Sequence, residues 1–215
     1  MKLSTRRLTM IGMLCAIAFV IVAFVRIPVV AFLKYEPKDV VITIGGFLFG
    51  PLSAFLISAV VSLVEMVTIS DTGIIGCIMN LLSTCAFACT AAFVYKKKHT
   101  LKGAIVGLLA GIAVMVGLML LWNYLITPYY MGYPREAVAA MLVPVFLPFN
   151  LLKGGLNAGI TLLIYKPVVG ALRRAKLLEA PAQAAPKKGN LGVMLVGALV
   201  VVTCTFFVLV LQGVL

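Results

Sequence analysis

The chain has 215 residues, of which 63% are apolar and only 11% are charged, and its formal net charge is +12. Soluble domains hold roughly 45–50% apolar and about 25% charged residues, so this composition excludes an ordinary water-soluble fold and indicates a membrane domain. The basic residues form short clusters between apolar runs rather than a stripe interleaved with aromatic residues. They therefore mark membrane topology and do not indicate a nucleic-acid partner.

Seven apolar segments, separated by charged or Pro/Gly-rich breaks, follow one another along the chain. They are residues 8–25, 40–49, 52–69, 74–95, 101–121, 141–163 and 191–211. A helix needs about 20 apolar residues to cross the hydrocarbon core, so the second segment is too short to span alone as an ordinary helix. Gly45, Gly46, Gly50 and Pro51 crowd its end and favour tight pairing with a neighbouring helix.

The predicted fold is an all-α integral membrane protein with a six-helix bundle and one additional C-terminal transmembrane helix. Residues 1–176 form the bundle in this prediction. Residues 177–190, rich in Ala, Pro and Lys, form a cytoplasmic linker because they hold too little apolar surface to fold. Residues 191–215 contain the seventh helix.

Lysine and arginine are distributed unevenly between the two sides that this topology defines. If each of the first six segments crosses the membrane, the N-terminus, the cluster around Lys96–Lys102 and residues 166–188 lie on one side. That side is strongly basic, whereas the loops opposite mix acidic and basic residues. The bias predicts a multi-pass protein of the cell membrane with a cytoplasmic N-terminus.

Several polar residues lie within apolar segments, where each costs free energy unless it is paired or faces a polar cavity. Asn150, Lys153 and Asn157 recur at spacings of three and four and form one stripe on the sixth helix. Glu65 and Asn80 are the other candidates, and Ser83 lies one turn after Asn80. The stripe indicates either a structural Lys153–Glu65 ion pair or a ligand that accepts hydrogen bonds.

Aromatic residues cluster where the fifth long helix leaves the membrane, between Trp122 and Tyr133, and include Tyr124 next to Asn123. Aromatic belts at membrane interfaces are routine. The same group beside an external loop also suits stacking on a flat conjugated ligand, and the two interpretations are compatible.

Small residues form two further faces. Gly12 and Ala16 are four residues apart on the first helix, and Gly103, Gly107 and Gly111 form a ladder on the fifth long helix. Such faces permit close helix contact in lipid, either within the bundle or with a partner membrane protein.

The chain lacks the patterns expected of an enzyme or of an ATPase. The glycine-rich run from Gly45 to Gly50 is followed by Pro51 rather than Lys-Ser or Lys-Thr, so it is not a phosphate-binding loop. His99 is the only histidine and lies in a lysine cluster, and the five cysteines form no metal-binding pattern. We therefore expect no catalytic residues, no metal site and no enzymatic activity.

Five stretches, in this order along the chain, carry a resemblance to a known family. They are Phe32-Leu-Lys-Tyr-Glu-Pro-Lys-Asp39, Ile44-Gly-Gly-Phe-Leu-Phe-Gly-Pro51, Glu65 with Thr72-Gly73, Gly76–Ser83 with its Met79-Asn80, and Asn150–Asn157. With these, residues 5–175 resemble the substrate-binding S components of energy-coupling factor (ECF) vitamin transporters, and among them those specific for riboflavin.

The resemblance implies a six-helix bundle that binds riboflavin from the extracellular side as transported ligand, with no cofactor. It also implies that Gly12 and Ala16 on the first helix dock on a transmembrane coupling subunit driven by two ATPase subunits. The ligand-binding residues carried over by position are Tyr35, Asp39, Glu65, Thr72, Asn80, Asn123, Tyr124, Asn150, Lys153 and Asn157. The seventh helix departs from the family pattern.

Three alternatives stay open at this point. The ligand could be another vitamin or a phosphorylated flavin (FMN), for which Lys34, Lys38 and Arg135 offer basic groups. A membrane-embedded enzyme would use Glu65 or Lys153 as acid or base, but paired catalytic groups are absent. A self-sufficient secondary carrier would show an internal repeat, which this sequence lacks.

Overall fold

The structure of this protein, a computed structural model, describes residues 5–30, 33–70, 72–175, 177 and 191–212. The first half contains α1 (Thr5–Phe24), β1 (Ile27–Val30), β2 (Leu33–Tyr35), α2 (Lys38–Phe49), α3 (Pro51–Thr68), α4 (Gly73–Thr84), the π-helical turn η1 (Cys85–Cys89) and α5 (Thr90–Lys97). The second half contains α6 (Leu101–Leu125), α7 (Thr127–Met131), α8 (Arg135–Met141), the π-helical turn η2 (Leu142–Phe146), α9 (Leu147–Arg174) and α10 (Leu191–Leu211).

Six helical stretches of the described chain are long and apolar enough to cross a membrane. Two of them are continuous through a π-helical turn: α4 to α5 through η1, and α8 to α9 through η2. The remaining helix of the predicted seven, α2, has 12 residues and is too short to span alone, as its sequence predicted. The all-helical membrane bundle with an additional C-terminal helix is confirmed.

The largest departure from the predicted boundaries lies between residues 122 and 140. The sequence predicted no helix between its apolar segments 101–121 and 141–163, but α6 continues to Leu125 and two short helices follow it. The segment Arg135–Met141 contains three Ala together with Arg, Glu and Met, all of which favour helix, and Pro134 immediately precedes it. Gly132, at φ 68°, supplies the left-handed residue that ends α7.

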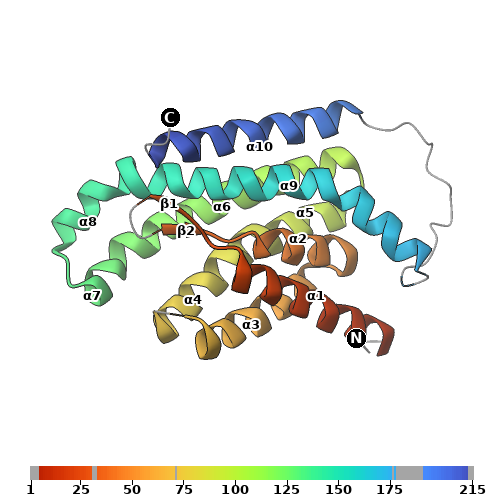
Figure 1. The fold of residues 1–215 in the computed structure, drawn as a ribbon, viewed down its shortest axis with the longest axis horizontal. Helices are drawn as coiled ribbons and strands as arrows, with labels where there is room; N and C mark the ends of the chain where they lie inside the picture. The colour runs from red at the N-terminus through yellow and green to blue at the C-terminus, as the bar shows by residue number, and fades with distance from the viewer. Residues whose placement is uncertain (1–4, 31–32, 71, 176, 178–190, 213–215) are drawn as a thin grey trace.

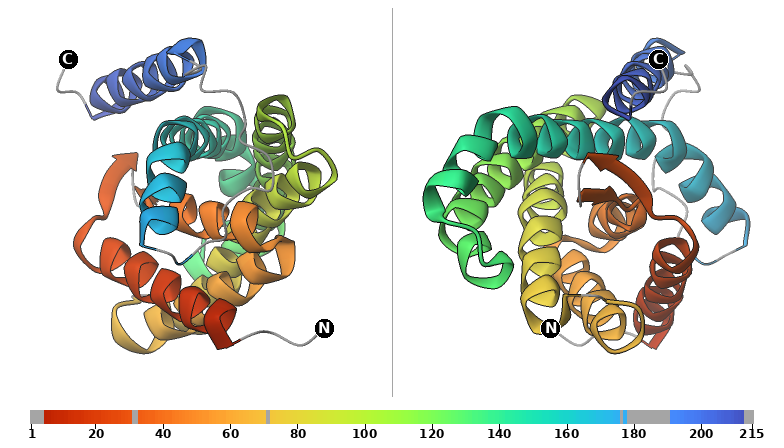
Figure 2. Two further views of the ribbon diagram at one scale, coloured as in Figure 1. Left: turned by 90° about the vertical axis from the view of Figure 1, so that its right-hand side faces the viewer. Right: turned by 60° about the vertical axis from the view of Figure 1, so that its left-hand side comes forward.

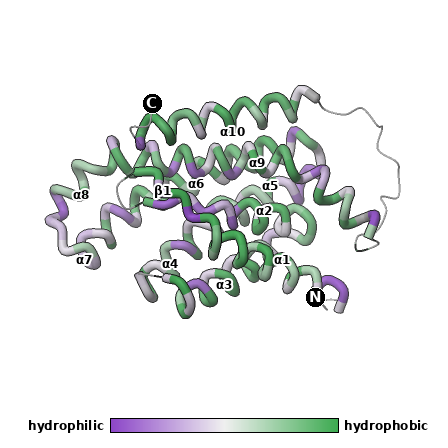
Figure 3. Tube along the Cα trace, viewed as in Figure 1, coloured by the Kyte–Doolittle hydropathy of each residue, from purple (hydrophilic) through white to green (hydrophobic). Residues whose placement is uncertain are grey.

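The predicted linker lies outside the described residues apart from Leu177. Beyond it, α10 has the bounds that its apolar run predicted, Leu191–Leu211. Figure 1 shows α10 lying along α9 on one edge of the bundle, with α1 and α3 at the opposite edge, and the two views of Figure 2 agree. Figure 3 shows that α10 is hydrophobic along most of its length.

A short antiparallel hairpin of β1 and β2 covers one end of the bundle. Its register pairs Ile27 with Tyr35 and Pro28 with Lys34. The α3–α4 connection and helices α7 and α8 lie at the same end (Figure 1), as does the C-terminal end of α10. The loops predicted to share one side of the membrane are therefore gathered at one end of the fold.

The glycine ladder of α6 packs inside the bundle. A Cβ atom added at Gly107 would lie 2.7 Å from the Ala91 carbonyl oxygen, and one at Gly111 would lie 2.6 Å from the Phe87 carbonyl oxygen. Only glycine permits this approach of α6 to α5 and η1. Gly12 on α1 differs, because a Cβ atom there would meet nothing within 4 Å.

We predict that Gly111→Ala lowers the free energy of unfolding by about 1–3 kcal/mol, since the added methyl group would push α6 away from the η1 backbone. Gly117→Ala is the matched control on the same helix, because a Cβ atom at Gly117 meets nothing within 4 Å. The free energy of unfolding of both variants is measured in detergent by titration with dodecyl sulfate. Equal stabilities would contradict the packing described here.

Candidate ligand-binding site

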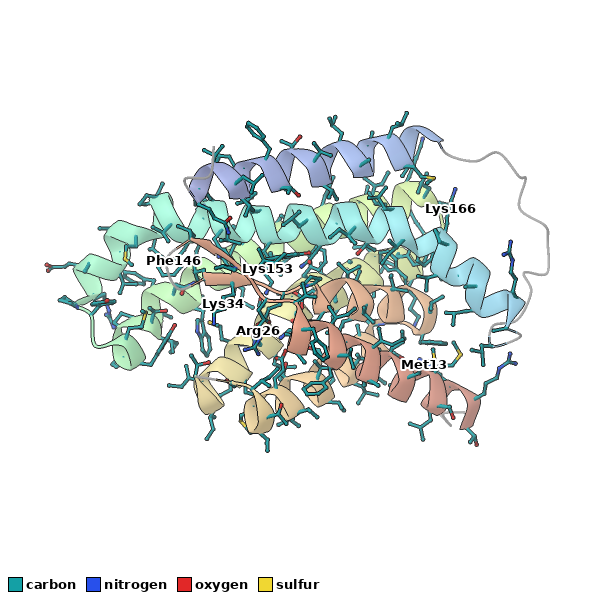
Figure 4. All side chains as sticks on the ribbon, in the orientation of Figure 1. Met13, Arg26, Lys34, Phe146, Lys153 and Lys166 are labelled. Carbon is teal, nitrogen blue, oxygen red and sulfur yellow. The ribbon has the colours of Figure 1, made fainter. Side chains whose placement is uncertain are left out.

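A cavity of about 410 Å³ lies at the hairpin end of the bundle, within the size range of small-molecule sites. Three connections and the four helices α3, α4, α6 and α9 contribute to it. Its lining is Arg26, Leu33, Lys34, Glu36, Glu65, Ser70, Thr72, Met79, Asn80, Ser83, Met119, Asn123, Tyr130, Met131, Phe146, Phe149, Asn150 and Lys153. Figure 4 shows Arg26, Lys34, Phe146 and Lys153 gathered in this part of the fold, far from Lys166.

A chain of ion pairs connects the first loop to α3 at one side of the cavity. Glu36 lies 3.6 Å from Arg26 Nε and 2.8 Å from Lys38 Nζ, and Lys38 Nζ lies 2.5 Å from Glu65 Oε1. Asn80 donates from α4 to the same Glu65 carboxylate at 3.4 Å. Because Lys38 is only 1% exposed, its charge is held in the interior by these two carboxylates.

A second buried network surrounds Asp39, which is fully buried. Its carboxylate accepts hydrogen bonds from the Thr84 hydroxyl at 2.7 Å and from Asn157 Nδ2 at 3.2 Å. Lys153 Nζ lies 3.3 Å from Asp39 Oδ2 and donates to Ser83 Oγ at 3.3 Å. Lys153 also lines the cavity, so this network reaches the ligand space through its ammonium group.

The hairpin is tied to the same network by Tyr35. Its hydroxyl donates to Asn157 Oδ1 at 3.0 Å, while the amide nitrogen of Asn157 donates to Asp39. Burial raises the pKa of the Tyr35 phenol, and the nearby Asp39 carboxylate raises it further. The phenol therefore remains a hydrogen-bond donor at neutral pH.

The two other lining amides are fixed by their own helices. Asn123 donates to the Met119 carbonyl at 2.7 Å and accepts from the Thr127 hydroxyl at 2.9 Å. Asn150 donates to the Phe146 carbonyl at 2.7 Å, at the junction of η2 and α9. Pro144 lies inside η2, and its missing N–H interrupts the regular α-helical ladder just before Asn150.

Six of the ten predicted ligand-binding residues line the cavity: Glu65, Thr72, Asn80, Asn123, Asn150 and Lys153. The other four do not belong to its described lining. Tyr35, Asp39 and Asn157 form the network beneath it. Tyr124 is 38% exposed, and the Arg135 guanidinium lies 5.6 Å from its ring centroid. Direct ligand contact stays a prediction for all ten.

The ion pair considered between Lys153 and Glu65 does not correspond to the pairing in the structure. Lys153 faces Asp39, and Glu65 faces Lys38. Both partners come from the start of α2, which lies between the other two groups along the site. Sequence spacing alone could not choose between these arrangements, because Lys38 and Asp39, Glu65, and Lys153 lie on three different helices.

Several lining residues escaped the sequence analysis. Arg26, Lys34 and Glu36 were interpreted as part of a nearly balanced mixture of loop charges, and Lys34 also as a basic group for a phosphorylated flavin, but all three line the cavity. Phe146 lies four residues before Asn150, so extending the polar stripe back by one turn would have identified it. Met119 and Met131 carry no sequence signal that separates them from ordinary core residues, whereas Met79 belongs to the Met79-Asn80 pair that carries the family resemblance.

In chemical terms the site offers amides, an ammonium group, carboxylates and hydroxyls on a background of Phe and Met side chains. Such a site can orient a ligand that has both donors and acceptors around a flat apolar body. In the described part of the chain, no group of three or more His, Cys, Asp or Glu residues is placed to hold a metal ion.

The chain matches the family described as "ECF transporter, substrate-specific component" over residues 6–165, and it belongs to that family. It is 30% identical to the "Riboflavin transporter RibU" of Staphylococcus aureus, over 79% of this chain and 93% of that protein. It is 31% identical to the "Riboflavin transporter FmnP" of Bacillus subtilis, over 71% of this chain and 86% of that protein.

A solved structure described as "Structure and mechanism of the S component of a bacterial ECF transporter" has the same fold. The TM-score is 0.67 at 29% sequence identity, and the match covers 80% of this chain and all of the other. The chain is therefore an S component in fold and in family. Because the family match ends at residue 165, α10 lies beyond it.

We predict that Asp39→Asn and Lys153→Met each lower the free energy of unfolding by about 3 kcal/mol or more, because each leaves a buried charge without its partner. The double variant should lose clearly less free energy of unfolding than the two single variants lose together, since it removes both charges at once. Unfolding in detergent measures all three, with Lys166→Met as the exposed control on the same helix. Strictly additive losses would show that the two groups are not coupled.

Proposed function

We propose that this protein is the riboflavin-binding subunit of an ECF-type importer of the cell membrane. The observation that carries the proposal is the cavity at the hairpin end, where amides and a buried ammonium group converge beside two phenylalanines. The names printed for the two relatives, both riboflavin transporters, support riboflavin as the ligand.

The lining suits both parts of a riboflavin molecule. The isoalloxazine ring is flat and conjugated, with carbonyl and ring-nitrogen acceptors that Lys153, Asn80 and Asn150 can serve as donors. Phe146 and Phe149 supply apolar surface for the ring. Polar groups of the first and second loops that line the cavity, among them Lys34 and Ser70, can bind the ribityl hydroxyls.

The charges near the cavity favour an uncharged ligand. Glu65 is held by Lys38, and Lys153 by Asp39, before any ligand is present. An FMN phosphate would add a charge of about −1.5 to −2 among groups that already have opposite-charge partners. Since both carboxylates and the ammonium group are engaged in this way, we assign no acid–base role and no catalytic activity to them.

ATP-driven transport requires partner subunits, because no phosphate-binding loop is present in the sequence. In this proposal riboflavin enters the cavity from outside, the basic end of the bundle faces the cytoplasm, and a transmembrane coupling subunit with two ATPase subunits drives uptake. The face of α1 that carries Gly12 and Ala16 is exposed along the side of the bundle and offers a flat surface for the coupling subunit.

We predict that the fluorescence of tryptophan and of the flavin is quenched when riboflavin is titrated into the purified protein. The quenching should saturate at one flavin per chain. Lys153→Ala should weaken binding about ten-fold or more through the lost charged hydrogen bond. Lys166→Ala is the matched control, since Lys166 is exposed on the same helix at the far end (Figure 4). A parallel titration with FMN shows which of the two flavins the protein binds more tightly. A flat riboflavin titration with folded protein would refute the proposal.

We predict that Gly12→Leu and Ala16→Leu abolish riboflavin uptake by cells and copurification with the coupling subunit, because the larger side chains separate two closely packed helices. Riboflavin binding to the isolated protein should stay unchanged. Ala113→Leu, at an exposed position of α6, is the control. Uptake equal to that of the control would place the docking face elsewhere.

A further inference from the structure

Helix α10 makes a close crossing with α9. A Cβ atom added at Gly159 would lie 3.1 Å from the Gly197 carbonyl oxygen, and one at Gly197 would lie 3.2 Å from the Gly159 carbonyl oxygen. One turn earlier on α9, a Cβ atom at Gly155 would meet Cys204 Sγ at 2.9 Å. Glycine at these positions brings the two backbones together, so α10 is fixed on the bundle.

The C-terminal end of α10 reaches past α9 to the hairpin. Val208 is buried, at 7% exposure, in one apolar cluster with Val29 and Tyr35 of the hairpin and with Phe149 and Leu152 of α9. Gln212 Nε2 donates a hydrogen bond to the Pro28 carbonyl oxygen of β1. Figure 1 shows this end of α10 beside β1.

The other side of the same hairpin faces the cavity. Lys34 of β2 lines it and Glu36 follows immediately, while Leu33 both lines it and packs against the apolar cluster that contains Tyr35 and Val208. Tyr35, between Lys34 and Glu36, points the opposite way into the network of Asn157 and into the apolar cluster with Val208. The strand therefore has a ligand side and a side supported by α9 and α10.

We propose that α10 is an intramolecular brace that holds the hairpin against α9 and thereby sets how fast ligand enters and leaves the cavity. This inference rests on the proposed ligand site, and Val208 and Gln212 are its positioning residues. Neither lines the cavity, so both act through the hairpin.

The brace predicts a kinetic effect that differs from that of a ligand contact. Its contacts exist in the ligand-free structure, so they oppose displacement of the hairpin whether or not ligand is bound. Association and dissociation both require that displacement, and loosening the brace accelerates both. A residue that touches the ligand changes mainly the dissociation rate and hence the affinity.

The test compares Val208→Ala with Val210→Ala, the same substitution on the same helix at a buried and at a 42% exposed position. Stopped-flow measurement of riboflavin fluorescence gives the association rate constant when protein and ligand are mixed. It gives the dissociation rate constant when the complex is diluted. For Val208→Ala we expect both rate constants to rise about three- to ten-fold, with Kd within about two-fold of wild type. Val210→Ala should resemble wild type.

A second measurement needs no ligand. Backbone hydrogen exchange of β1 and β2 should be faster in Val208→Ala and in Gly197→Leu, which wedges α10 away from α9. Gly192→Leu is the control for the latter, because a Cβ atom at Gly192 meets nothing within 4 Å.

The outcomes separate this inference from the proposed function. If riboflavin binds wild type but Val208→Ala and Val210→Ala exchange it at equal rates, the brace is refuted and the proposed function stands. A change in Kd through dissociation alone also refutes it. If wild type binds no riboflavin while hydrogen exchange of the hairpin still depends on Val208, the proposed ligand fails and the mechanical link between α10 and the hairpin stands.

Discussion

A carboxylate that is fully enclosed by helices is stable only if donors from its surroundings compensate for the lost water, and Asp39 is such a group. Thr84 reaches it from the end of α4, and Asn157 and Lys153 reach it from α9. Two of the three elements that meet at this carboxylate, α4 and α9, also supply polar lining of the cavity. The need to satisfy one buried charge therefore fixes the relative positions of the helices that form the site.

The residue before Asp39 extends this constraint to the other side of the cavity. Lys38 is buried between Glu36 and Glu65, whereas its neighbour Asp39 faces Lys153. Two adjacent residues of opposite charge at the start of α2 therefore pair with different parts of the site. Asp39 in the first turn also complements the positive end of the helix dipole. Because α2 has only 12 residues, its start lies inside the bundle, where both residues meet side chains of the long helices.

The sequence predicts well what depends on hydrophobic length and spacing. All seven apolar segments are helices, and the polar stripe of α9 faces the cavity and the network below it, because membrane segments bury their polar groups together.

The sequence predicts poorly what depends on tertiary placement. The partners of Glu65 and Lys153 were not evident, since Lys38 and Asp39 look like loop charges until the hairpin and α2 are placed. Helix α7 and the π-helical turn η2 escaped because each depends on local backbone geometry around Pro128, Gly132 or Pro144 rather than on apolar periodicity. The other π-helical turn, η1, contains neither proline nor glycine and has no such signal in its sequence.

The ion pairs of the site have a further consequence for a protein that works across an energised membrane. They join the cations Arg26, Lys38 and Lys153 to the anions Glu36, Asp39 and Glu65, so three positive and three negative charges sum to zero. Moving one elementary charge through 100 mV changes the free energy by about 2.3 kcal/mol. These six paired groups therefore add no net charge to the electric field when they take up an uncharged ligand, whereas Lys34, which also lines the cavity, adds one positive charge.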